Sequence, residues 1–264
     1  MNLEPLPPNR LRMLNVFKKQ YRETDNKKAL FEKWTHYFTE SILNKKQFNR
    51  YDNESAEDER ESDTGKGWTS QLLENSRLNK RAQYIATNVK ECDFCLAAHE
   101  LSLGISSMKN HLQAKRSDQI KPDGLAVRKN GFFSVFEIKA FNDIQKIDEA
   151  LLQAICGALA IYAKRSMIVA IARSDNGPFR PAIKNARIPK LKPSLGVHLL
   201  MAADDKGDPI KGWSKKIELL SAEILENFKQ LEYIAFSFLN RKQAKDIRTI
   251  TISYLITRDG IKRL

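Results

Sequence analysis

The sequence predicts a mixed α/β fold in which helices flank a central β-sheet and a helical extension precedes it. Three observations carry this prediction. Residues 9 to 49 place apolar side chains at helical spacing, residues 123 to 139 alternate like two paired strands, and the remaining chain switches between the two periods. With 264 residues, the chain is long enough to bury a full hydrophobic core.

The N-terminal region is expected to form two helices, with Thr24-Asp25-Asn26 supplying a turn and an N-cap between them. Their apolar stripes are Leu11, Leu14, Phe17 and Tyr21, and then Leu30, Trp34, Phe38, Ile42 and Leu43. Residues 51 to 67 are polar and strongly acidic, which is typical of a flexible linker or a solvated loop. We therefore divide the chain into a helical extension with an acidic linker, 1–67, and a main domain, 68–264.

The main domain is expected to begin with a second helical region at 68–103, which Gly104 ends. Two strand-like runs then flank Asn130-Gly131, the strongest short-range signal for a β-hairpin. Beyond the hairpin we expect a helix at 142–163, strands at 167–172 and 197–201, a helix at 222–239 and a last strand at 247–256.

Composition indicates a polyanionic partner. Lys and Arg number 45 against 32 Asp and Glu, a formal charge of +13, and nucleic acid is the first partner that such a charge suggests. Solubility alone is the alternative explanation. The chain has no run of about 18 apolar residues and no recognisable secretory signal. Its three cysteines are an odd number, so we expect no disulfide framework. Together these features predict a cytoplasmic protein without membrane contact.

One constellation of residues carries chemistry. Pro122-Asp123 and Glu137-Ile138-Lys139 are the only Pro-Asp and Glu-x-Lys sequences in the chain. Because side chains alternate across a strand, Glu137 and Lys139 share one face. The predicted hairpin brings Asp123 opposite Glu137, and two carboxylates at one point suit Mg²⁺, with Mn²⁺ as an alternative. A solvent-facing strand end that happens to carry an acid and a base is the competing interpretation.

These residues resemble the defining motif of the PD-(D/E)xK phosphodiesterases, which have the restriction-endonuclease-like fold. The resemblance covers residues 91–172. It implies that Asp123, Glu137 and the Ile138 carbonyl ligate a metal ion. It also implies that Lys139 positions or polarises the attacking water.

The family resemblance also implies accessory residues. Many members add an acid from a preceding helix, for which Glu100 is the first candidate here and Glu91 the second. Some branches carry a glutamine on the helix after the Glu-x-Lys strand, and Gln153 matches that position. Those branches often have tyrosine four residues later, where this chain has Gly157.

Two weaker signals remain. A proline-containing loop that could contact phosphates, or be solvated surface, carries the basic residues Arg180, Lys184, Arg187, Lys190 and Lys192. Cys92, Cys95 and His99 offer three potential soft metal ligands on one predicted helix, with His111 as a possible fourth. Buried free cysteines are the commoner explanation of such a pair. His36 and His198 have no companions in the sequence, and we interpret them as ordinary core or surface histidines.

The sequence therefore predicts a Mg²⁺-dependent nuclease that acts on DNA, with an endonuclease favoured over an exonuclease. Two alternatives from other classes stay open. One is a nucleic-acid-binding module that keeps the fold without catalysis. The other is a protein that recruits partners through its N-terminal helices. A homodimer is a further expectation, because cutting two strands in this fold often implies two sites.

Overall fold

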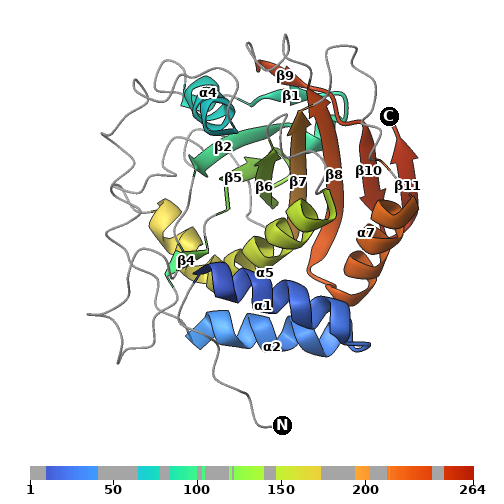
Figure 1. Cartoon of the computed structure of the whole chain (residues 1–264). Helices are drawn as coiled ribbons and strands as arrows, with labels where there is room; N and C mark the ends of the chain where they lie inside the picture. Colours follow the sequence, from blue (N-terminus) through green and yellow to red (C-terminus); the bar gives the residue numbers. More distant parts are fainter. Residues whose placement is uncertain are drawn as a thin grey trace.

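The computed structural model describes residues 10–40, 65–77, 84–99, 103–104, 119–120, 122–139, 147–173, 194–202, 213, 215–239 and 247–264. A seven-stranded sheet forms its centre, with strand order β11-β10-β8-β7-β6-β5-β2 and helices on both faces (Figure 1). The predicted mixed α/β architecture is confirmed at this level.

The strands of this sheet are β2 (Phe94–His99), β5 (Gly124–Arg128), β6 (Phe133–Lys139), β7 (Leu195–Ala202), β8 (Leu231–Leu239), β10 (Tyr254–Thr257) and β11 (Gly260–Arg263). Two small sheets pair β1 (Ala86–Thr87) with β9 (Thr249–Ile250) and β3 (Leu103–Gly104) with β4 (Gln119–Ile120). The helices are α1 (Arg10–Glu23), α2 (Lys27–Glu40), α4 (Gly65–Arg77), α5 (Ile147–Arg173), α7 (Lys215–Asn227) and the short 3-10 helix η3 (Lys90–Cys92).

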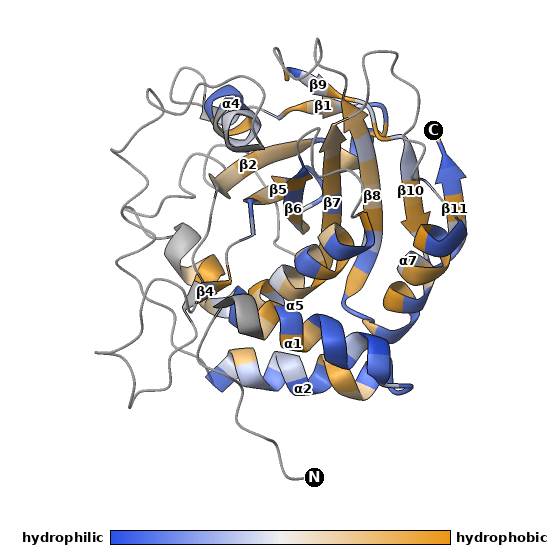
Figure 2. Cartoon of the chain, viewed as in Figure 1, coloured by the Kyte–Doolittle hydropathy of each residue, from blue (hydrophilic) through white to orange (hydrophobic). Residues whose placement is uncertain are grey.

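The middle of the sheet is parallel and its two flanks are antiparallel. Strands β6, β7 and β8 run parallel, whereas β5, β2, β10 and β11 pair antiparallel to their neighbours. Parallel neighbours need a crossover connection, and α5 and α7 lie in the two connections concerned. Strands β7 and β8 are therefore covered on both faces and are coloured as hydrophobic along most of their length (Figure 2).

The predicted hairpin is confirmed. Strands β5 and β6 pair antiparallel, and the Gly131 N–H donates to the Arg128 carbonyl at 2.9 Å to close the turn. Gly131 has a φ of 88°, a backbone conformation that favours glycine. The Asn-Gly chemistry of the turn thus sets the register that aligns the ends of the two strands.

Helices α1 and α2 form the predicted N-terminal pair. The Asn26 side chain caps α2, because its Oδ1 accepts the Ala29 N–H at 3.0 Å. Phe17 and Trp34 are buried edge to face, and Phe31 packs on Phe228 beyond α7. The inner faces of both helices therefore belong to the same core as α5 and the sheet. The boundary at residue 67 stays a prediction.

Three predicted elements are wrong in type. Part of the helical region at 68–103 is strand, because β2 has buried apolar side chains that pair with β5 and contact α4. The strand predicted at 167–172 belongs to α5, which continues to Arg173 with buried Ile168 on its inner face. The helix predicted at 222–239 ends at Asn227, and β8 follows between β7 and β10.

The C-terminal strand prediction was too simple. Residues 247–256 contain the short strand β9 and the start of β10, separated by a bend. A further strand, β11, pairs with β10 across a turn in which Gly260 has a φ of 133°. The Asp259-Gly260 dipeptide is the turn signal that could have revealed this hairpin.

Helix α5 is the central helix of the larger core. Its segment Ile147–Ala170 is long and apolar enough to cross a membrane by length and composition alone, and 61% of that stretch is buried within the fold. It contacts α1, α2, β6 and β7. Such burial is what the core helix of a folded domain shows.

Candidate metal and active site

The ends of β5 and β6 bring the predicted acids together. Gly124 pairs with Phe136, so one further step in the same register puts Asp123 opposite Glu137. Asp123 Oδ2 accepts the N–H of Ile138 at 2.7 Å. This N–H belongs to the peptide group that joins Glu137 to Ile138, so the Asp123 carboxylate lies beside the backbone of Glu137.

The Glu137 carboxylate lies on the α5 face of the sheet. Its strand neighbours on that face, Phe133 and Val135, belong to the α5 core, whereas Phe136 and Ile138 pack with α4 on the other face. Glu137 is fully buried. A buried carboxylate is costly unless a positive charge or hydrogen-bond donors accompany it. The competing interpretation of a solvent-facing strand end is therefore wrong for Glu137.

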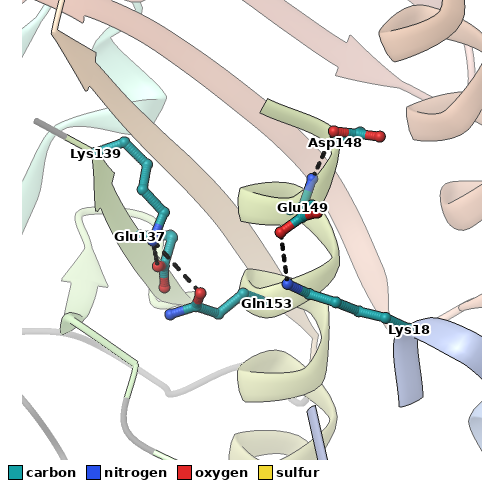
Figure 3. Close-up of polar contacts among 6 residues, drawn as sticks. All are labelled: Lys18, Glu137, Lys139, Asp148, Glu149 and Gln153. Carbon is teal, nitrogen blue, oxygen red and sulfur yellow. Dashed lines mark hydrogen bonds and ion pairs between the residues drawn. The ribbon is translucent and has the colours of Figure 1, made fainter. Parts of the chain in front are cut away.

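Lys139 supplies that positive charge. Its Nζ lies 2.6 Å from Glu137 Oε1, and its side chain is 20% exposed. The same nitrogen donates to Gln153 Oε1 at 3.4 Å (Figure 3). Gln153 is half-buried on α5, so the helix contributes a neutral polar group to an otherwise charged cluster. The structure therefore brings together Asp123, Glu137, Lys139 and Gln153.

Gly157 explains how α5 comes this close to the hairpin. A Cβ atom at position 157 would lie 3.3 Å from Pro122 Cβ and 3.5 Å from Val135 Cγ1. The first distance is tighter than ordinary van der Waals contact. A tyrosine at this position would collide with the Pro-Asp corner, which gives a local reason for the departure from the glutamine-tyrosine pattern.

The first turn of α5 is tied to neighbouring helices by ion pairs. Lys18 of α1 reaches Glu149 at 3.3 Å, and Lys216 of α7 reaches Asp148 at 3.3 Å. Figure 3 shows the Lys18 contact one turn before Gln153 on the same helix. Acidic residues also suit the positive end of a helix dipole. These contacts hold the helix that carries Gln153, and the sequence patterns did not predict them.

Several predicted residues lie outside the described residues. They are Glu100, Arg180, Lys184, Arg187, Lys190, Lys192 and His111. The second candidate acid, Glu91, is exposed in η3. It lies near the hairpin turn, because Phe94 pairs with Arg128 at the opposite end of β5 from Asp123. Glu91 is therefore not the additional acid of this site.

Cys92 and Cys95 do not lie on one helix, as the sequence pattern had indicated. Cys92 lies in η3 and Cys95 in β2, and their side chains enter different core clusters. All three cysteines are buried and free of disulfides. Within the described ranges, no group of three or more His, Cys, Asp and Glu side chains is arranged to hold a metal ion. This leaves the commoner explanation, buried free thiols, for Cys92 and Cys95.

The carboxylate pair fits Mg²⁺ better than a soft metal. Asp123 and Glu137 offer hard oxygen atoms, and the Ile138 carbonyl is the next oxygen along the strand. Mg²⁺ usually keeps several waters and needs only one or two protein carboxylates. A pair of this kind therefore meets its requirements without a third acidic side chain.

A second polar network lies on the opposite face of the sheet. Arg128 is fully buried and donates to the Cys92 carbonyl, to Ser134 Oγ at 3.3 Å and to His198 Nδ1, which is 3.0 Å away. His198 Nε2 lies 2.8 Å from Ser237 Oγ. Burial, with a smaller contribution from Arg128, lowers the pKa of His198 well below 6.5. His198 thus has companions that the linear sequence did not reveal.

No family model, curated protein or solved structure matches the chain.

Proposed function

We propose that this chain is a Mg²⁺-dependent nuclease of the PD-(D/E)xK type, an endonuclease that hydrolyses phosphodiester bonds in DNA. One observation carries the proposal: the Asp123 carboxylate accepts a hydrogen bond from the Glu137-Ile138 peptide N–H, while Lys139 forms an ion pair with Glu137. The net charge of +13 supports a polyanionic substrate. The mixed sheet with two parallel crossovers supports the finer proposal of a restriction-endonuclease-like fold.

Asp123, Glu137 and the Ile138 carbonyl would hold the ion, with Mn²⁺ as a substitute for Mg²⁺. When bound, the ion supplies positive charge to the phosphoryl oxygens and makes a bound water more acidic. Asp123 is oriented for this role by the hydrogen bond that its Oδ2 accepts from the Ile138 N–H.

Lys139 and Gln153 perform the remaining protein part of the chemistry. The Lys139 ammonium donates to the attacking water or to a phosphoryl oxygen and stabilises charge that develops there. Gln153 Oε1 restrains this ammonium through the 3.4 Å contact. The burial of Glu137 keeps bulk water from one side of the cluster, which strengthens its electrostatic interactions.

The proposal is tested by cleavage of circular and linear DNA, each single- and double-stranded, in Mg²⁺ and in EDTA. We expect cleavage of a closed circle in Mg²⁺, none in EDTA, and a loss of about 10²-fold or more for Asp123→Ala and Lys139→Ala. Lys164→Met is a matched control. It replaces a buried lysine of α5 whose Nζ donates a hydrogen bond to the Thr39 carbonyl, away from the site.

Full activity in either site variant would overturn the assignment. Salt-sensitive DNA binding without cleavage in any divalent metal would instead favour a binding module on the same fold. Loss of activity in the Lys164→Met control would show that the assay reports folding and not chemistry.

A further inference from the structure

The Glu137–Lys139 pair has a consequence for metal binding. Lys139 Nζ lies 2.6 Å from Glu137 Oε1, so the ammonium already satisfies the charge of a fully buried carboxylate. Mg²⁺ ligated by this carboxylate would lie about 2.1 Å from an oxygen of the same group. The two cations would then be within about 5 Å of each other in a poorly solvated site, where like charges repel strongly.

A second acceptor for the ammonium is already in place. Gln153 Oε1 lies 3.4 Å from Lys139 Nζ, on the helix that packs over the strand end. The lysine side chain is a flexible four-carbon chain and is 20% exposed. A shift of its ammonium from Glu137 to Gln153 therefore needs only rotation about side-chain bonds. A neutral amide oxygen can accept a hydrogen bond from the ammonium. Unlike a carboxylate, it adds no negative charge that would draw the metal ion away from Glu137.

From these contacts we infer that Lys139 and the divalent cation compete for Glu137, and that Gln153 receives the displaced lysine. This inference rests on the proposed function, because it assumes that Asp123 and Glu137 bind a metal ion. Lys139 therefore has a role beyond water activation: it sets the metal affinity of the site and balances the buried charge when no cation is bound. Gln153 is a positioning residue that acts through Lys139.

The inference predicts opposite changes in two variants. Lys139→Met removes the competitor, so Mg²⁺ should bind on the order of tenfold more tightly although cleavage is lost. Gln153→Leu removes the second acceptor, so Mg²⁺ should bind roughly tenfold more weakly. A purely structural role for Lys139 would instead weaken metal binding together with activity.

Calorimetric titration of the full chain with Mg²⁺ measures these affinities directly. Thermal unfolding with and without Mg²⁺ is the second readout. Without the ion, Lys139→Met loses the ion pair of a buried carboxylate and should melt at a lower temperature than wild type. With the ion, the difference from wild type should largely disappear, because the tighter binding expected of Lys139→Met stabilises its folded state more. The control Lys164→Met should keep wild-type affinity and gain the same rise in melting temperature from Mg²⁺ as wild type.

The outcomes separate this inference from the proposed function. Equal or weaker Mg²⁺ binding by Lys139→Met, with normal binding by wild type, overturns the competition and leaves the nuclease proposal standing. An absence of Mg²⁺ binding in both proteins overturns both. If Lys139→Met does not fold even with Mg²⁺, the Gln153→Leu titration decides: weaker binding supports the exchange, and unchanged binding contradicts it.

Discussion

The two faces of the central sheet each carry a positive charge, but its surroundings differ between them. On the α5 face, Lys139 is partly exposed and is paired with the buried carboxylate of Glu137. On the α4 face, Arg128 is fully buried and donates to a carbonyl, a hydroxyl and an imidazole, all neutral. A partly exposed ammonium paired with a carboxylate can exchange that partner for another group, as we propose for Lys139. A cation enclosed by neutral acceptors and aromatic rings can only hold the fold together.

This difference predicts that changes on the α4 face affect stability and changes on the α5 face affect chemistry. Arg128 also lies over the rings of Phe94, Phe136 and Tyr233, at 5.0 to 5.5 Å from its guanidinium carbon to each ring centroid. It therefore connects β5 to β2, β6 and β8 through contacts that no single hydrophobic side chain could replace.

The largest effect is expected for Arg128→Ala. The change leaves a cavity and removes the donors that serve His198 and the Cys92 carbonyl, so the free energy of unfolding should fall by about 3–5 kcal/mol. Urea denaturation measures this value. DNA cleavage per folded molecule should stay near the wild-type level, and a selective loss of cleavage without loss of stability would break the distinction between the two faces.

The next effect is a pH dependence that originates at His198. Its pKa in the folded state is lowered, so the unfolded chain takes up a proton below pH 6.5 while the buried imidazole does not. Stability is therefore fully present above this pH and is lost as the pH falls, with a slope approaching about 1.4 kcal/mol per pH unit.

The groups that face His198 are the Arg128 guanidinium and the Ser237 hydroxyl, with the rings of Phe94 and Phe136 beside them. None of these can offer negative charge to an imidazolium. His198→Gln should flatten the acid limb of a stability profile measured between pH 7 and pH 5. The same change at exposed His36 is the control and should leave the limb unchanged. An identical slope in both variants would contradict the assignment.

Local chemistry explains why the site itself could be predicted from the sequence. The Asn130-Gly131 turn determines the hairpin register, and the register alone brings Asp123 to Glu137. Alternation along β6 then places Lys139 on the same face. The position of Gln153 needed one more step, the packing of α5, and the family resemblance supplied it. Each of these inferences depends only on residues that are close in the sequence, within the hairpin and the helix that follows it.

Long-range pairing explains what could not be predicted. Strands β2 and β8 are buried on both faces, so their apolar runs lack the alternation that distinguishes a strand from a buried helix. The strand predicted at 167–172 is another such apolar run, yet no glycine or proline ends α5 before Arg173 and burial favours its continuation. The link between Arg128 and His198 joins residues 70 positions apart, and no sequence pattern marks it.

The smallest effect is expected for Gly157→Ala. The added Cβ would press on Pro122 at 3.3 Å and move α5 by a few tenths of an ångström, which costs about 1–3 kcal/mol, partly offset by a gain of about 1 kcal/mol in helix propensity. Cleavage should fall severalfold, because Gln153 moves with the helix. Ser166→Ala, at an exposed position of α5, is the matched control for propensity alone. Wild-type cleavage in Gly157→Ala would show that the close packing of α5 on the hairpin is not required for activity.

The most direct test of the central claim is nicking of supercoiled plasmid DNA in Mg²⁺ by wild-type protein and by Glu137→Gln. The substitution keeps the size of the buried side chain, removes its charge and replaces one carboxylate oxygen with an amide NH2 group. The site described above predicts that wild type converts the plasmid to open circles and linear molecules, while Glu137→Gln, assayed at a temperature at which it is folded, does not. Cleavage by Glu137→Gln at the wild-type rate would contradict the assignment of a metal-dependent active site to this strand end.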